Sequence, residues 1–229
     1  MEKIEFRKLN ANEIDCRVAT VKQPQVSADG KMSGGGCSIL LYKDARVDMR
    51  LLDEMFGALG WKREHQTIDV RLYCTISVYD ERIGQWVSKQ DVGTESYTEK
   101  EKGQASDSFK RAGFNWGIGR ELYTAPFIWI VPKEKEWRRT NNGFQLNVNL
   151  RVESIEYEND EIIFLRLVDN EGNVRYSWGT SPRKAKDMEM VQNAENIEAL
   201  KSIYKDSMYR DDKEFIAAVN KRKAELQAA

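Results

Sequence analysis

A segment near residue 50 has the apolar spacing of an amphipathic helix. Between Asp48 and Gly60, apolar residues recur at intervals of three or four, which places them on one side of a helix. Glycine readily adopts the left-handed conformation that ends a helix, so Gly60 stands where a C-terminal cap belongs. We predict a helix that follows a short leader, stops before Trp61, and has its apolar face formed by Leu51, Leu52, Met55, Phe56 and Leu59.

The apolar spacing then changes to two and predicts a β-hairpin. From Ile68 to Val78, apolar and polar residues alternate, as in a half-buried strand. Residues 80–84 supply a turn, and Gln85–Gly93 is expected to return antiparallel. Cys74 falls on the apolar side of the alternation, which favours a small core residue.

A second helix is predicted from about Glu99 to Trp116. Thr98 and Glu101 have the spacing of a capping box, which marks a helix N-terminus. At about 100° per residue, four apolar residues fall within a narrow arc: Ala105, Phe109, Ala112 and Trp116.

Further strands and a charged tail follow. Apolar runs or alternations at 127–131, 144–152, 162–168 and 174–178 predict a second set of strands. From Pro182 onward the composition shifts to charged helix formers. We therefore divide the chain into a core with appended strands, residues 1–181, and a charged C-terminal helical segment, residues 182–229.

The overall charge of the chain does not indicate a class of binding partner. The chain has 36 Lys and Arg against 37 Asp and Glu, a net charge of −1, so no excess charge directs it toward nucleic acid or anionic lipid. It contains no apolar run of about eighteen residues, and its first residues lack the pattern of a signal peptide. We expect a soluble cytoplasmic protein without a membrane partner.

Scarce residue types argue against common enzyme chemistries. The single histidine, His65, lies in the charged stretch 62–66, where we expect a solvated loop. The three cysteines lie far apart and form no CxxC motif, so neither a zinc site nor a disulfide framework is supported. No phosphate-binding loop motif occurs. We expect no metal, no nucleotide, no other cofactor and no enzymatic activity.

An ordered series of motifs spans residues 31–123. The motifs are Lys31-Met32-Ser33-Gly34-Gly35-Gly36, Tyr42, Arg46-Val47, Glu54-Met55-Phe56-Gly57, Gly60-Trp61, Asp91-Val92-Gly93, the helix segment 105–112 and the stretch 117–123. This succession resembles the Rad52 family of single-strand annealing recombination proteins, and the compact tail favours the bacteriophage or bacterial, Sak-like branch.

This resemblance implies an α+β fold. Its centre would be a β-β-β-α annealing core, an antiparallel hairpin sheet packed on helices, with additional C-terminal strands and helices. It also implies a homo-oligomeric ring or open spiral that holds single-stranded DNA in a positively charged groove and anneals complementary strands in recombination or repair without ATP. A phage exonuclease and a host single-strand-binding protein are candidate partners.

The same resemblance assigns DNA-binding residues. Lys31 takes the place of a groove-lining arginine, Lys110 and Arg111 match a helical Lys-Arg pair, and Lys102 matches a lysine earlier on that helix. Arg46 is a further candidate. The triplet Gly34, Gly35 and Gly36 either forms a flexible loop or lets backbone N–H groups approach phosphates closely.

Two departures reduce the expected positive charge of the groove. Phe114 stands where a eukaryotic relative has a further arginine, and Glu99 and Glu101 replace basic residues. Helical geometry independently places Lys110, Phe114 and Arg111 opposite the buried arc, at about 140°, 180° and 240° from Ala105. Cations and aromatic rings together suit single-strand binding. The alternative is that the two cations only solvate the helix and Phe114 packs against a neighbouring subunit.

Other positions and functions stay open at this point. Tyr73 and Tyr79 stand on the polar side of the long strand and either stack on bases or meet other protein surfaces. A basic-aromatic cluster surrounds Trp137 and contains Lys133, Lys135, Arg138 and Arg139. The alternative functions are protection of DNA ends without annealing, and a structural oligomer that has lost DNA binding.

Overall fold

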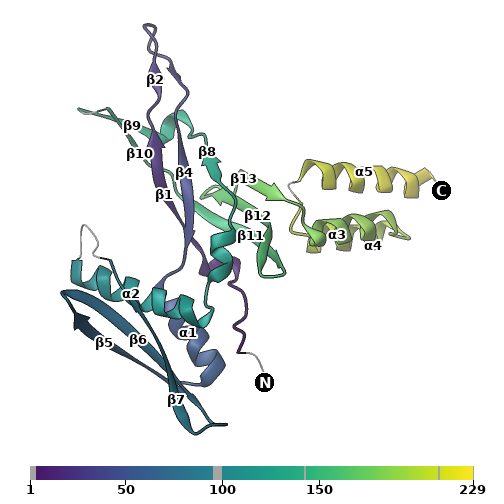
Figure 1. Ribbon diagram of the computed structural model, residues 1–229. Helices are drawn as coiled ribbons and strands as arrows, with labels where there is room; N and C mark the ends of the chain where they lie inside the picture. The colour runs from purple at the N-terminus through teal and green to yellow at the C-terminus, as the bar shows by residue number, and fades with distance from the viewer. Residues whose placement is uncertain (1–3, 95–99, 142, 211, 229) are drawn as a thin grey trace. The chain divides into compact units, whose positions relative to one another are not determined.

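The computed structural model describes residues 4–94, 100–141, 143–210 and 212–228 (Figure 1). The chain divides into two compact units, Met1–Trp178 and Gly179–Ala229. The larger unit combines antiparallel sheets with helices, so the fold is of the predicted α+β class.

A three-stranded antiparallel sheet packs against a long helix in the larger unit. The sheet has the order β5-β6-β7, and the helix α2 follows it directly in the chain. The predicted hairpin is therefore confirmed as β6 and β7, and the elements form a β-β-β-α unit. Their bounds are β5 (Trp61–Ile68), β6 (Arg71–Asp80), β7 (Gln85–Val92) and α2 (Lys100–Trp116).

The apolar arc of α2 forms the core of this unit, as predicted. Phe109 and Ala112 are fully buried, and the indole N–H of Trp116 donates to the carbonyl oxygen of Ile76 in β6 at 3.1 Å. Burial of each such aromatic side chain contributes about 1.5–3 kcal/mol to stability. Thr98 and Glu99, including the capping-box threonine, lie outside the described residues.

The first helix ends earlier than the sequence predicts. The helix α1 (Ala45–Phe56) begins after Asp44, whose carboxylate accepts a hydrogen bond from the backbone N–H of Arg46 at 2.8 Å. It ends at Gly57, which has a φ of 72°. Glycine tolerates this positive φ without steric cost, so the first glycine after the apolar face ends the helix and Gly60 is not the cap. Leu59 accordingly lies outside the helix and is 94% exposed.

The charged stretch before the hairpin is a strand and not a loop. His65 lies in β5, where it is exposed and pairs with Cys74 of β6. Ile68 also belongs to β5, whereas Val70 lies in the turn with a φ of 61°. Because β5 is an edge strand, its charged side chains remain in water, and the apolar alternation that marks buried strands is missing.

A six-stranded antiparallel sheet forms the rest of the larger unit, in the order β13-β12-β11-β1-β4-β8. Its strands β1 (Asp15–Lys22) and β4 (Gly36–Tyr42) fall in the segment predicted as a short leader, so that prediction was wrong. The later strands occur as predicted, except that the alternation over 144–152 divides between two strands. Their bounds are β8 (Ile128–Ile130), β10 (Gly143–Leu146), β11 (Leu150–Glu158), β12 (Glu161–Asp169) and β13 (Val174–Gly179).

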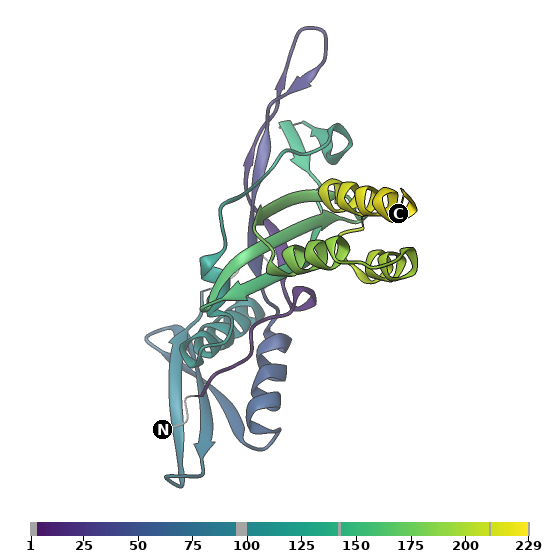
Figure 2. The same cartoon turned by 90° about the vertical axis from the view of Figure 1, so that its right-hand side faces the viewer.

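Two small hairpins and three short turns complete this unit. The hairpin of β2 and β3 continues from β1 and β4 and projects beyond the six-stranded sheet (Figures 1 and 2). The hairpins and 3₁₀ turns are β2 (Gln25–Val26) with β3 (Met32–Ser33), β9 (Trp137–Thr140) with β10, and η1 (Ala11–Glu13), η2 (Arg120–Thr124) and η3 (Glu134–Glu136).

The smaller unit is helical and has its own core. It contains α3 (Pro182–Gln192), α4 (Ile197–Asp206) and α5 (Lys213–Ala228). Phe215 and Tyr209 are fully buried, and the Tyr209 hydroxyl lies 2.5 Å from the hydroxyl of Ser181. Among the residues described, no helix is both long and apolar enough to cross a membrane.

Candidate nucleic-acid interface

The two adjacent cations on α2 point toward different neighbours. Arg111 is 48% exposed at its side chain, and its Nε lies 3.2 Å from Oδ1 of Asp91 in β7. Lys110 is half-buried and lies one helical turn before Gly113, where α2 approaches Asp48 of α1. Hydrogen bonds from Arg46 lower the pKa of Asp44, and the positive charge of Lys110 lowers it further. Lys110 therefore adds to the positive potential at the start of α1.

An aromatic and cationic cluster adjoins these residues at the C-terminal end of α2. The Phe114 and Tyr123 ring centroids lie 4.8 Å apart, and the Arg120 guanidinium lies 5.5 Å from the Phe114 ring. Arg120 also donates to the carbonyl oxygens of Phe114 and Asn115, which satisfies the end of the helix. Tyr123 is 79% exposed, so the cluster presents a ring to solvent.

Sequence reasoning missed Arg120 and Tyr123 as members of this cluster. Phe114 is half-buried and packs within its own chain, on the residues that follow α2. The return of the chain depends on Gly119, which has a φ of 74° and precedes η2. The motif 117–123 was the available signal, because its glycines indicate a tight turn and its last residue is aromatic.

A buried ion pair lies beside α2. The Lys43 ammonium contacts the Asp48 carboxylate, and both residues are buried. A Cβ on Gly113 would lie 2.5 Å from Oδ1 of Asp48, so α2 approaches this pair at a position that only glycine fits. Burial raises the pKa of Asp48 to about 6, although the neighbouring charges of Lys43 and Lys110 oppose the shift.

The first motif forms a hairpin and the start of a strand. Lys31 is exposed in the turn between β2 and β3, with its Nζ 3.4 Å from Oδ2 of Asp29. Gly34 and Gly35 have φ values of 67° and 81°, so this part of the chain needs glycine. Gly36 begins β4, and a Cβ there would collide with the Trp129 side chain.

The remaining predicted cations lie at the starts of the two helices. Arg46 is exposed near the N-terminus of α1, and its Nε lies 2.7 Å from Oδ1 of Asp44. Lys102 is exposed in the first part of α2. The charges of Arg46 and Lys110 both lower the pKa of Asp44, which lies at the start of α1.

The structure does not bring all predicted site residues together within one chain. Lys110, Arg111 and Phe114 share α2, and the charges of Lys110 and Arg46 both influence Asp44. Figures 1 and 2 both show the β2–β3 hairpin, which carries Lys31, at the far end of β1 and β4 from α2. The predicted cations therefore lie in two separate places, on the helices and on the hairpin.

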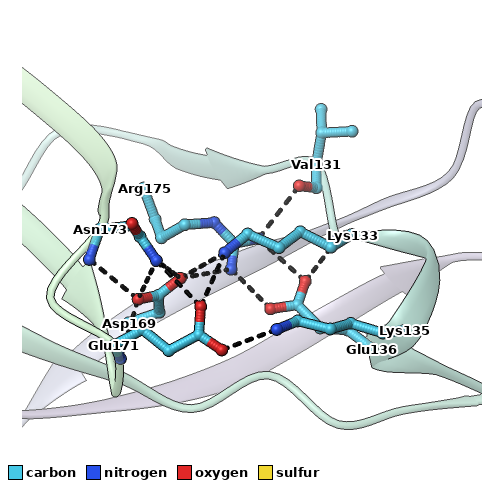
Figure 3. A network of polar contacts seen from close by, with 8 residues as sticks. All are labelled: Val131, Lys133, Lys135, Glu136, Asp169, Glu171, Asn173 and Arg175. Atoms are coloured by element: carbon cyan, nitrogen blue, oxygen red, sulfur yellow. Dashed lines mark hydrogen bonds and ion pairs between the residues drawn. The ribbon is translucent and has the colours of Figure 1, made fainter.

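Two cations of the basic-aromatic segment around Trp137, Lys133 and Lys135, are tied to other parts of the chain (Figure 3). The Lys133 ammonium lies 2.6 Å from Asp169, and the Lys135 ammonium lies 2.7 Å from Glu171. The hydrogen bond from Lys133 is the main cause of the lowered pKa of Asp169. These two lysines thus hold η3 against the turn that follows β12.

No group of three or more His, Cys, Asp or Glu side chains among the described residues could hold a metal ion. No curated protein matches the chain. The model of the Rad52/22 family double-strand break repair protein matches residues 7–141. The matched region covers more than half of the sequence and includes the β-β-β-α unit, the β2–β3 hairpin and the cluster after α2. The chain therefore belongs to the Rad52/22 family of double-strand break repair proteins.

Proposed function

We propose that this chain binds single-stranded DNA and anneals complementary strands without ATP, as a non-enzymatic oligomer in recombination or repair. Its setting would be the cytoplasm of a bacterial or phage-infected cell, where an exonuclease or a single-strand-binding protein would supply or release the strands. Membership of a DNA repair family supports the class of activity. The surface of α2 supports the binding step.

The main support is the combination of cations and rings at one end of α2. In this proposal Lys110 and Arg111 contact phosphates, and the exposed ring of Tyr123, which lies next to Phe114, stacks on a base. Single strands are held by electrostatic contacts along the backbone and by stacking of bases on aromatic side chains. Stacking tolerates any base, which suits a protein that must accept any complementary pair of strands.

An exposed strand edge supports assembly into an oligomer. β8 ends the six-stranded sheet. Trp129 within this strand, and Phe127 and Val131 directly before and after it, keep apolar surface in solvent. The Phe127 and Trp129 rings stack with centroids 6.2 Å apart. Exposed apolar edges of this kind mark interaction sites. A ring or spiral would cover β8 and add the weak DNA contacts of many protomers.

A structural oligomer without DNA binding is the second candidate. Lys31, Arg46 and Arg111 each lie within 4 Å of a carboxylate of the same chain, at distances of 3.4, 2.7 and 3.2 Å. These carboxylates reduce the positive potential that a phosphate would meet. Protection of DNA ends without annealing would share the binding surface and differ only in the outcome.

The test measures duplex formation from two fluorescently labelled complementary oligonucleotides without ATP. We expect the protein to accelerate annealing well above the spontaneous rate. The Lys110→Ala/Arg111→Ala variant should lose most of this acceleration, and its salt dependence of binding should weaken by about 0.7 in log–log slope for each lost phosphate contact. The control is Lys205→Ala/Lys213→Ala, which removes the same charge from exposed positions in the helical unit.

Each outcome separates the candidates. Tight binding without acceleration indicates end protection. No binding at low salt indicates a structural oligomer. Unchanged annealing by an intact Lys110→Ala/Arg111→Ala oligomer would show that the DNA site lies elsewhere.

A further inference from the structure

The smaller unit carries a groove that the proposed DNA site does not use. The groove lies between α4 and α5 and has a volume of about 240 Å³. Its floor is aliphatic, and Tyr204 closes one part of it. The floor residues are Ile197, Leu200, Ile216 and Val219.

Part of the apolar floor remains accessible. Leu200 and Val219 belong to the buried core of the unit, whereas Ile197 and Ile216 are only half-buried. The two isoleucines lie on different helices, so their exposed surfaces face the groove from both sides. Covering this surface would remove apolar area from water, which is the main favourable contribution to association.

The charged residues that line the groove are both cations. Lys201 of α4 and Lys223 of α5 are exposed, and among the described residues neither forms an ion pair. The lining includes no carboxylate. By contrast, Lys184 of the same unit pairs with Asp212 and Glu214 at 3.0 and 2.7 Å. Two unpaired ammonium groups therefore flank an apolar floor.

This pattern fits an acidic peptide better than it fits DNA. Bases stack on accessible ring faces, and one face of the Tyr204 ring, which is the single aromatic among the described residues that line the groove, is stacked on Phe215, with centroids 6.4 Å apart and planes at 7°. The aliphatic floor suits Leu, Ile or Phe side chains, as in grooves that receive amphipathic segments. The lysines would meet carboxylates on either side of such anchors.

We propose that the groove between α4 and α5 binds a short acidic segment of a partner protein through apolar anchor residues and carboxylates. This site would recruit a protein to the oligomer independently of the DNA surface on α2. Its occupant is defined by charge and apolar pattern, so it is a peptide and not a nucleic acid.

The test selects binders from a displayed library of random short peptides on the full-length chain. Selected peptides should combine several Asp or Glu residues with Leu, Ile, Phe or Trp. Synthetic copies with a fluorescent label should then bind wild-type protein in solution. The Lys201→Glu/Lys223→Glu variant should bind them at least about tenfold more weakly, while Lys205→Glu/Lys213→Glu, with the same charge change outside the groove, should retain affinity. Binding should also weaken as salt is added.

Several results would overturn the proposal. They are a selection that yields no binder, a selection without acidic enrichment, and peptides that bind the groove and control variants equally well. A single-stranded oligonucleotide could instead displace the peptide from the wild-type protein. If the Lys201→Glu/Lys223→Glu variant no longer bound that oligonucleotide, the groove would be assigned to DNA. Annealing by Lys201→Glu/Lys223→Glu should remain at the wild-type rate, which separates this site from the one on α2.

Discussion

The ammonium group of Lys43 is paired with the carboxylate of Asp48 in the interior of the larger unit, beside Gly113 of α2. Lys43 is 7% exposed and Asp48 is 0% exposed. Oδ2 of Asp48 has no hydrogen-bond partner among the residues that the structure describes. Burying two charges is costly, and their mutual attraction offsets this cost only while both partners are present.

Removing one partner of the pair should therefore lower the free energy of unfolding more than removing both. Asp48→Ala leaves a buried cation and should lower the free energy of unfolding by about 3–5 kcal/mol. The double variant Lys43→Met/Asp48→Leu should lose clearly less free energy of unfolding than Asp48→Ala, because apolar side chains of similar size fill the same space. Urea denaturation measures both. A double variant that is less stable than the single one would contradict this account.

Titration of Asp48 should make the stability of the fold depend on pH. The pKa of Asp48 is about 6 in the folded protein, against 3.8 for an aspartate in the unfolded chain. Between these two pH values the folded state holds a proton that the unfolded state has released. Raising the pH through this window therefore favours unfolding, by about 3 kcal/mol for this group. Asp48→Asn should remove that decline. The free energy of unfolding is measured against pH for the wild-type protein and for Asp48→Asn, and the difference between the two curves is the contribution of Asp48. Parallel curves would show that Asp48 makes no such contribution.

Tyr123 should contribute to binding of single strands through stacking. Its ring is 79% exposed beside Phe114, so Tyr123→Ala should weaken oligonucleotide binding by about 1–3 kcal/mol with little change in salt dependence. Tyr79→Ala is the comparison, because Tyr79 is also exposed but packs beside Trp86 on the hairpin. Fluorescence anisotropy measures both affinities. Equal losses would argue against a specific role for Tyr123.

The edge strand β8 should control assembly. Phe127 is 74% exposed and Val131 is 67% exposed, so Phe127→Ser/Val131→Thr should shift the protein toward smaller species in light scattering after gel filtration. Ile83→Ser/Val70→Thr changes two exposed apolar residues, at 58% and 93%, in turns of the three-stranded sheet and should leave the mass unchanged. An unaltered mass for the β8 variant would place the interface elsewhere.

The local spacing of apolar residues was sufficient to predict the helices and strands that have one buried side. Cys74, Ile76 and Val78 alternate in β6, and Phe109 and Ala112 share the buried arc of α2, because each pattern reports burial directly. The cations on α2 were visible for the same reason, since residues opposite a buried arc face outward. The motif series also identified the family.

Elements that depend on distant pairing were not predicted. β5 is a charged edge strand, so its sequence shows no burial pattern, and its strand conformation comes from pairing with β6. β1 joins β4 and β11, which are far apart in the chain, to complete the six-stranded sheet. Gly57 ends α1 before Gly60 because the chain must turn there to enter β5.

The sequence by itself determined the β6–β7 hairpin, the buried face of α2, the outward cations and the family, because these rest on residue order and short-range spacing. Only the tertiary structure decided which partners those cations meet. Arg111 faces Asp91, Lys110 acts on the start of α1, and Tyr123 returns to Phe114 through the turn at Gly119. Such contacts join residues from different elements, and their geometry is set by packing that no local pattern records.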